Sequence, residues 1–351
     1  MPLLLAGACG DSDDEAATSD SDRVELTRVS IGTGIGTPVL SISNAFVLPE
    51  YLGFWEEEGL DVDLQPNEGG SGGVIQALEV GNLDVGHAGA APLPAAIASG
   101  IDLVAFFVEH RQNYHWPAVL PGSEIEEPED LVGKKIGVHS LTAASVAYTK
   151  EYISRAGGDP AKIEFVAVGV GADAAEALKA GHVDAIVMWA HAYVGLESVG
   201  YEFRYLPDLL EEMGFQTVTF AKRDFVEDPA NHDTLVGLAR GMAKAMIFAA
   251  ERPDCAVRAL WDVYPEARPT GISEEQALKN GITEMEANAK YEVPADDGRW
   301  GDATHDEVAL FLKVLSSDLD VDDIWTDELI EEINDFDHDA IREMAEDFEC
   351  G

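Results

Sequence analysis

Two short segments of the chain carry side chains suited to holding a small polar ligand. Residues 87–90 (HAGA) and 189–191 (WAH) each contain a histidine, which can donate or accept a hydrogen bond. Trp189 adds a flat apolar face on which a ring can stack. We therefore predict a ligand held between the two segments, with contacts from His87, Gly89, Ala90, Trp189 and His191.

The same nine-residue pattern precedes both segments. ALEVGNLDV at residues 77–85 recurs as ALKAGHVDA at residues 177–185, one hundred positions later. Gly81 and Gly181 stand where a helix ends, because glycine accepts the left-handed backbone of a C-cap. A chain that builds the same helix–turn–strand unit twice indicates two similar lobes, whose strand ends would face one cleft.

Strands and helices alternate through the middle of the chain, which is typical of βαβ units in a largely parallel sheet. We expect strands at residues 29–31, 60–64, 84–87, 103–108, 135–138, 163–168 and 185–188, and helices at 72–80, 91–99, 142–156 and 172–180. From residue 231 the apolar spacing is helical. There we expect helices at 235–250, from 253, and at 273–289, 304–315, 326–334 and 337–348.

These elements predict an α/β fold of two lobes with a helical C-terminal region. Extended runs at residues 116–120 and 216–220 would cross between the lobes. Lobe 1 is therefore expected to comprise residues 28–118 and 219–351. Lobe 2 would be an insertion of residues 119–218, and residues 1–27 would lie outside both.

The charge of the chain is strongly negative. Its 67 acidic and 22 basic residues give a formal net charge of −45, spread along the whole length. A nucleic-acid partner is excluded, because phosphate binding requires a surplus of Lys and Arg. Such self-repulsion weakens a fold in dilute buffer but is screened within about 3 Å at 1 M salt. The composition therefore indicates a protein adapted to high salt.

The amino terminus resembles the lipobox of an exported lipoprotein. An apolar run, LLLAGAC, ends at Cys9 and is followed by an acidic stretch without periodicity at residues 10–22. Ala6 replaces the usual leucine, and no basic residue precedes the run. We expect lipidation at Cys9 and attachment to the outer face of the cytoplasmic membrane by this anchor alone, since no apolar stretch approaches the length of a membrane span.

The remaining candidate sites are weaker. Cys255 and Cys350 could form one disulfide, and neither has a histidine at catalytic spacing. Residues 32–36 (GTGIG) depart from the dinucleotide fingerprint and are followed by Pro38, so no nucleotide cofactor is expected. Histidines 110, 115, 182 and 191, with Tyr114 and Asp184, match no known metal-ligand spacing, and no metal is predicted.

Residues 51–62, YLGFWEEEGLDV, resemble the GFF-x-x-x-GLDV signature of binding proteins for sulfonates, nitrate, taurine and thiamine precursors. Further motifs follow in the order of that family: GSG at 70–72, GNLDVG at 81–86, LVGKKIGV at 131–138, GHVDA at 181–185 and IWTDEL at 324–329. The resemblance spans about residues 28–335. It implies a type II periplasmic-binding fold and a solute receptor for an ATP-driven importer.

In that family the ligand lies between the lobes, on strand-end loops and helix N-termini, which suit polar or anionic groups. Carried onto this chain, the resemblance implies ligand contacts from Ser43, Asn44, Ser71, His87, Gly89, Ala90, Ser140, Thr142, Trp189 and His191. Where the family often has W-x-P, this chain has Trp189-Ala190-His191. Trp116 either faces the cleft or packs in the hinge; both alternatives stay open.

The resemblance implies a monomeric solute-binding lipoprotein that delivers a small organic nutrient to the permease of an ABC importer, without catalysis. Arg and Lys are scarce in the candidate loops, which favours a planar heterocycle such as a pyrimidine over a sulfonate, taurine or nitrate. The alternative is a pyrimidine-synthesising enzyme of thiamine biosynthesis on the same fold. That enzyme depends on a cysteine-rich motif, which this chain lacks.

Overall fold

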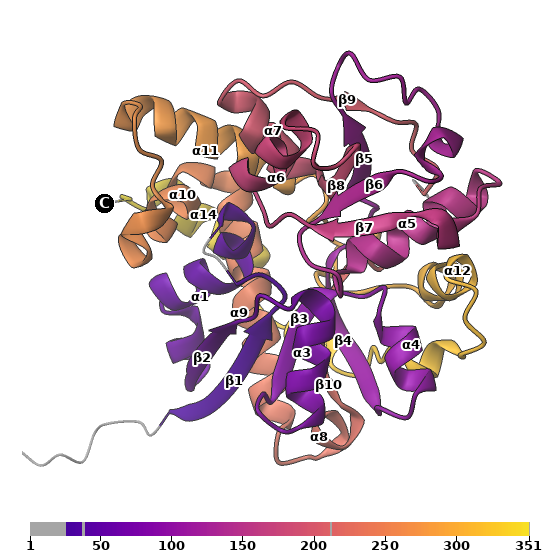
Figure 1. The fold of residues 1–351 in the computed structure, drawn as a ribbon. Coiled ribbons are helices and arrows are strands. Elements are labelled where there is room, and N and C mark those ends of the chain that lie inside the picture. Colours follow the sequence, from indigo (N-terminus) through magenta and orange to yellow (C-terminus); the bar gives the residue numbers. More distant parts are fainter. Residues whose placement is uncertain (1–25, 37–38, 211–212, 351) are drawn as a thin grey trace, which may run out of the picture.

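The chain folds around two five-stranded sheets. Figure 1 shows their arrangement in a computed structural model that describes residues 26–36, 39–210 and 213–350. Sheet A has the strand order β2-β1-β3-β10-β4, and sheet B has the order β7-β6-β8-β5-β9. We call sheet A with its helices lobe 1, and sheet B with its helices lobe 2. The predicted α/β fold with two lobes and a helical C-terminal region is confirmed.

In each sheet the strands run in one direction except for the single strand that enters from the other lobe. β10 runs antiparallel to β3 and β4, and β5 runs antiparallel to β8 and β9. The strands of sheet A are β1 Thr27–Thr33, β2 Leu60–Pro66, β3 Val85–Gly89, β4 Leu103–His110 and β10 Thr217–Lys222. Those of sheet B are β5 His115–Val119, β6 Lys135–Val138, β7 Glu164–Ala167, β8 Ala185–Trp189 and β9 Arg204–Tyr205.

Helices cover both sheets and form most of the C-terminal third. The helices of the first two thirds are α1 Leu48–Tyr51, α2 Phe54–Glu57, α3 Gly70–Glu79, α4 Leu93–Ala98, α5 Ala144–Arg155, α6 Ala172–Lys179 and α7 Ala190–Ser198. They are followed by α8 Arg223–Glu227, α9 His232–Glu251, α10 Pro253–Val263, α11 Glu274–Asn288, α12 His305–Val314, α13 Ile330–Ile333 and α14 His338–Asp347. A π-helix at Ser43–Val47 leads into α1.

The chain crosses from one lobe to the other a few residues earlier than expected at both crossings. β5 begins at His115 and pairs with β8, so the expected boundary between residues 118 and 119 falls within a strand of sheet B. β10 begins at Thr217, so the expected return at residue 219 falls within a strand of sheet A. The first crossing therefore ends before His115 and the second before Thr217.

The repeated sequence unit has the same geometry in both lobes. Gly81 and Gly181 have φ angles of 75° and 72°, the left-handed backbone of a helix C-cap. Asp84 Oδ2 then accepts a hydrogen bond from the Ser30 backbone N–H at 2.8 Å, and Asp184 Oδ2 accepts one from the Lys135 N–H at 2.8 Å. In each lobe the aspartate thus joins the start of one strand to its parallel neighbour.

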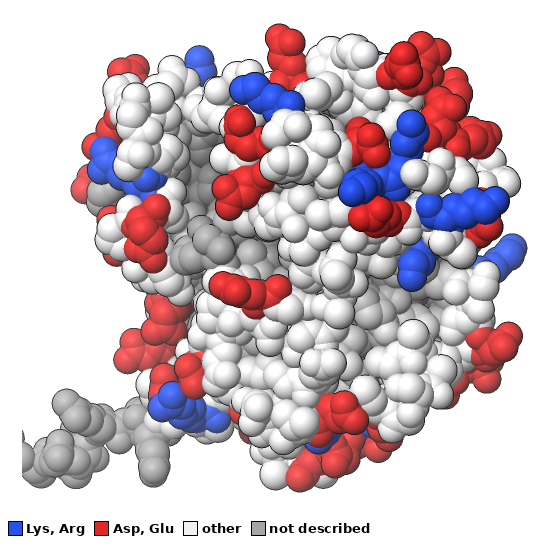
Figure 2. All heavy atoms as spheres, viewed as in Figure 1, with Lys and Arg blue, Asp and Glu red and all other residues white. Residues whose placement is uncertain are grey.

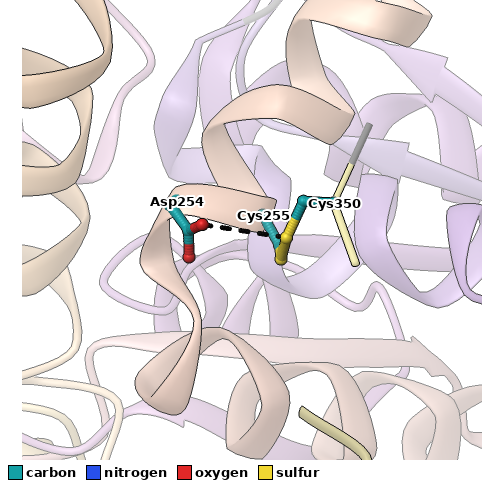
Figure 3. A group of neighbouring side chains, drawn as sticks. All are labelled: Asp254, Cys255 and Cys350. Atoms are coloured by element: carbon teal, nitrogen blue, oxygen red, sulfur yellow. Dashed lines mark hydrogen bonds between the residues drawn. A yellow bond between two sulfur atoms is a disulfide. The ribbon is translucent and has the colours of Figure 1, made fainter. Parts of the chain in front are cut away.

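Most of the C-terminal helices pack on lobe 1, whereas α11 packs on α7 of lobe 2, and the chain ends in a cross-link. α14 lies against α9, and its C-terminal carbonyls at Ala345 and Phe348 accept hydrogen bonds from Arg252 at 3.0 and 2.6 Å. Figure 3 shows the disulfide that joins Cys255 at the start of α10 to Cys350, with a Cα–Cα distance of 5.3 Å. The last helix is therefore held to the body of lobe 1 both covalently and by the Arg252 guanidinium.

Figure 2 shows acidic side chains both at the edge and toward the middle of one face, with Lys and Arg side chains among them and uncharged surface between. None of the helices in the described part of the chain has the length and apolar character needed to span a bilayer. The predicted lipidation residue, Cys9, lies outside the described residues.

Candidate functional site

A buried cavity of about 70 Å³ lies between the lobes. Lobe 1 lines it from the strand ends of β1, β3, β4 and β10, and lobe 2 lines it from β5, β8 and the first turns of α5 and α7. These strand ends meet at the cleft because the parallel strands of each sheet point their carboxyl ends toward it. A ligand here would contact both lobes at once.

Five of the nine histidines in the chain line this one cavity: His87, His110, His115, His139 and His191. Burial, together with the neighbouring His139 and His110, lowers the pKa of His115 to about 3. Burial also lowers the pKa of His139 and holds the pKa of His191 well below its usual value. The rings of His115, His139 and His191 are therefore neutral at physiological pH and can donate or accept hydrogen bonds.

One carboxylate, Glu109, lies among these rings. Its Oε2 atom is 2.9 Å from His87 Nε2 and 3.0 Å from His110 Nδ1. Burial raises the pKa of Glu109, but the neighbouring imidazoles of His110 and His87 outweigh that effect and hold the pKa below its usual value. Burial lowers the pKa of His110, yet Glu109 outweighs it and raises that pKa to about 9. Glu109 and His110 therefore form a buried ion pair at the cavity wall.

Behind this ion pair stands a second carboxyl group. Glu292 accepts hydrogen bonds from Asn44 Nδ2 at 2.6 Å and from Asn288 Nδ2 at 2.5 Å. Its Oε1 lies 3.9 Å from His110 Nε2. Burial and the charge of Glu109 raise the pKa of Glu292 to about 7. The network thus fixes His110 from both ring nitrogens, because Asn288 Oδ1 also lies 3.0 Å from His110 Nε2.

The aromatic side chains at the cavity are held in place by one another. The rings of His110 and Tyr114 stack with centroids 4.5 Å apart, and the Trp189 ring lies 6.0 Å from that of His191. Trp189 is 7% exposed and lines the cavity from the end of β8. Its apolar face is therefore available within the cleft rather than inside lobe 2.

Close contacts across the cleft show that the lobes are in a closed arrangement. The Gly72 N–H donates to the Thr142 carbonyl at 3.1 Å, and the Thr142 hydroxyl donates to the Gly69 carbonyl. A Cβ atom placed on Gly89 would lie 2.4 Å from the Cβ of Ala144 in α5. The absence of a side chain at Gly89 lets the start of α5 approach β3 this closely.

Five of the residues expected to contact ligand line the cavity. They are Ser71, His87, Gly89, Trp189 and His191. Ser140 and Thr142 instead lie at the contact between the lobes, beside Gly70 and Gly72. Ala90 is fully buried next to the cavity, and its N–H donates to the Gln216 carbonyl at 2.8 Å.

The structure places two expected residues, Ser43 and Asn44, and the undecided Trp116 away from the cavity. Ser43 and Asn44 enter a π-helix and are buried toward the C-terminal region, where Ser43 Oγ donates to the Ala256 carbonyl at 2.6 Å and Asn44 donates to Glu292. The side chain that lines the cavity from this segment is Ser41. Trp116 is half-buried between Tyr205 and Tyr291, at ring distances of 6.5 and 6.2 Å. It does not line the cavity.

Sequence reasoning missed Glu109 and His139, and considered His110, His115 and Tyr114 only as metal ligands, for which their spacing is unsuited. A signal was present: β4 reads LVAFFVEH, a continuous buried apolar run that ends in a Glu-His pair. Charged residues that close a buried parallel strand lie at the carboxyl edge of the sheet, where ligands bind. The same argument applies to His139, which directly follows β6.

A different cluster of potential metal ligands lies outside the cavity. Within the described residues, Asp254, Cys255 and Cys350 place one ligand atom each within 4.8 Å of the others. The two sulfur atoms are joined to each other, as Figure 3 shows, and so are not thiolates. This cluster is a structural cross-link.

Comparisons with known proteins agree with this geometry. The model of the family described as NMT1/THI5 like matches residues 43–256. The taurine-binding periplasmic protein of Escherichia coli (strain K12) is 27% identical over 230 residues, which cover 63% of this chain and 68% of that protein. The predicted resemblance to this group of binding proteins is confirmed, and the relative is a binding protein rather than an enzyme.

Solved structures show the same fold. A protein from Bordetella bronchiseptica RB50 has a TM-score of 0.69 at 24% identity, covering 88% of this chain and 98% of that one. The alkanesulfonate-binding protein from Xanthomonas axonopodis pv. citri, bound to MOPS, has a TM-score of 0.56 at 20% identity, covering 74% and 84%. These similarities support the two-lobed fold of a periplasmic binding protein.

Proposed function

Because this chain belongs to the NMT1/THI5-like family, we propose that it is the solute-binding component of an ABC importer. Such a component captures a small molecule outside the cytoplasmic membrane and presents it to a permease. The observation that carries the proposal is the buried cavity between two closed lobes, lined by groups from both. Closure of the lobes around a ligand would give the permease a surface to recognise.

The ligand is proposed to be a small organic molecule with a planar heterocycle, of the pyrimidine type. Trp189 and Tyr114 offer aromatic faces, and the neutral His115, His139 and His191 offer hydrogen bonds. Among the described residues that line the cavity there is no Lys or Arg. A sulfonate or nitrate, the ligand type of several relatives, would lack the guanidinium or ammonium partner that anion sites commonly use.

A thermal-shift screen of pyrimidines, flavins, taurine, alkanesulfonates and nitrate tests this proposal. It is best run in molar NaCl, where screening of the −45 net charge should itself raise the melting temperature.

Trp189→Ala should weaken binding of the strongest hit by about 1–3 kcal/mol, the scale for losing an aromatic stacking partner. Trp116→Ala is the matched control, since Trp116 does not line the cavity. Equal affinity of the Trp189 variant and the wild type would remove Trp189 from the site.

We propose that the chain is exported and held to the membrane by a lipid on Cys9. The support is the lipobox-like run that ends at Cys9 and the acidic stretch that follows it. Expressed with its complete export signal, Cys9→Ser should move from the membrane fraction to the soluble fraction, because a lipid chain supplies the membrane affinity. Unchanged membrane partition of the variant would contradict the anchor.

A further inference from the structure

The carboxylate of Glu109 is only half used by the protein. Its Oε2 atom faces both His87 Nε2 and His110 Nδ1, at 2.9 and 3.0 Å. Its Oε1 atom is buried and has no hydrogen-bond partner among the described residues. An ionised carboxylate offers about four acceptor sites, and a buried charge is costly unless these are satisfied. Glu109 therefore leaves a strong acceptor without a donor from the described part of the protein.

The backbone aims this side chain at the cavity. In a regular strand, consecutive side chains point to opposite faces, so Glu109 and His110 should not line the same cavity. Thr217 of β10 pairs with His110, however, while Val218 pairs with Val108, so Glu109 is the extra residue of a β-bulge. The bulge turns both Glu109 and His110 toward the cleft, the kind of re-aiming for which bulges are found beside binding sites.

The surrounding charges do not suit a ligand that is only anionic. The positive charge of His110 is already opposed by Glu109 at 3.0 Å and by Glu292 Oε1 at 3.9 Å. Burial lowers the pKa values of His115, His139 and His191, and these three rings are neutral. A negative ligand group placed near Glu109 Oε1 would be repelled by the carboxylate, whereas an N–H group would donate the hydrogen bond that Oε1 lacks.

We propose that Glu109 is a specificity-determining residue, whose Oε1 accepts a hydrogen bond from an amino or other N–H group of the ligand. The inference rests on the proposed solute-binding function and narrows its ligand class. The ligand would be a small molecule that carries an N–H donor on a body able to pack against Trp189 and Tyr114. Phe46, which lines the same cavity, adds apolar contact for that body.

Matched pairs of compounds test the donor directly, in calorimetric titrations of the wild-type protein. One pair is taurine and ethanesulfonate; the other is 4-amino-2-methylpyrimidine and 2-methylpyrimidine. Within at least one pair, the member with the amino group should bind roughly 10- to 100-fold more tightly, the range that a hydrogen bond to a charged group supplies. Equal binding within both pairs would overturn the proposal.

Glu109→Gln keeps the shape of the side chain and removes its charge. It should lower the affinity for the amino-bearing compound roughly 10- to 100-fold and change that of its donor-free partner by less than about threefold. Glu58→Gln is the control: it also removes the charge of a largely buried carboxylate of lobe 1, but Glu58 pairs with Arg240 and Lys244 and does not line the cavity. The control variant should keep the wild-type ratio of affinities for the amino-bearing compound and its donor-free partner. If both variants lose this difference in affinity, the role of Glu109 is structural.

Failure of this inference is distinct from failure of the proposed function. If the chain binds solutes but Glu109 does not select them, compounds of the wider screen bind and the donor-free members of the pairs bind equally well. If the chain is not a solute-binding protein, no compound of the screen stabilises the wild type, and both proposals fall.

Discussion

Replacing Gly89 with alanine is expected to weaken ligand binding by about 1–3 kcal/mol, the usual cost of overpacking a well-packed contact. The new Cβ would lie 2.4 Å from the Cβ of Ala144, which belongs to the other lobe. The next nearest atom to this Cβ, outside Ala144, is Ser71 Oγ at 3.5 Å, which is an ordinary van der Waals contact. The clash therefore arises only when the lobes close, and each lobe should fold as before. Titration with the strongest hit of the screen measures the affinity, and small-angle scattering measures the separation of the lobes.

The same contact supplies a rescue. Ala144 is the first residue of α5, where glycine is tolerated, so the double variant Gly89→Ala/Ala144→Gly removes the clashing methyl group and should recover most of the affinity. Gly122→Ala is the matched control, because a Cβ at Gly122 meets nothing within 4 Å. If the double variant binds as weakly as Gly89→Ala alone, the loss does not come from closure.

The repeated unit made the lobes predictable. The end of the helix, the left-handed glycine and the aspartate before the strand all depend on interactions of the local backbone. A local sequence pattern can therefore predict them. Gly81 and Gly181 accordingly have nearly equal φ angles, and Asp84 and Asp184 each bind the N–H of a neighbouring strand. The match of both copies follows from short-range interactions that need no knowledge of the partner lobe.

Local sequence patterns failed to predict the secondary structure where the chain pairs with a strand distant in sequence. A helix was expected at residues 326–334, but the structure has only α13, Ile330–Ile333. The Ala105 N–H of β4 donates to the Ile324 carbonyl at 2.8 Å, and the Thr326 N–H donates to the Ala105 carbonyl at 3.0 Å. The segment therefore lies extended along the free edge of β4, and helical spacing yields to this long-range pairing.

The site was predictable in part for the same reason. His87, Trp189 and His191 follow the repeated turn, so their place at the cleft came from the local pattern together with the two-lobe fold. Glu109 depends on a bulge that forms only when β10 returns from the other lobe to pair with β4. Ser43 and Asn44 were assigned by resemblance alone, and a π-helix turns them toward Ala256 and Glu292 instead. Residues whose orientation depends on distant pairing cannot be read from spacing.

Replacing Cys350 with serine is expected to destabilise the protein by about 2–5 kcal/mol, the usual cost of removing a native disulfide. The bond links residues 95 positions apart, so its loss frees a long segment in the unfolded chain. Urea unfolding in molar NaCl measures the change, on a Cys9→Ser background in which Cys255 and Cys350 are the remaining cysteines. Two free thiols titrated in the unfolded, unreduced Cys9→Ser protein would show that the bond does not form.

The damage should be confined to the C-terminal helices. α14 would still be held by the hydrogen bonds from Arg252 to the Ala345 and Phe348 carbonyls, so hydrogen exchange should quicken first in residues 338–347 rather than in the sheets. None of the described residues that line the cavity comes from α10 or α14, so ligand affinity should be unchanged below the unfolding transition. Arg252→Ala, which removes the guanidinium but keeps the disulfide, is the matched comparison. If Cys350→Ser lowered ligand affinity as well as stability, the disulfide would have to influence closure of the lobes. It would then do more than stabilise the packing of α14 on lobe 1.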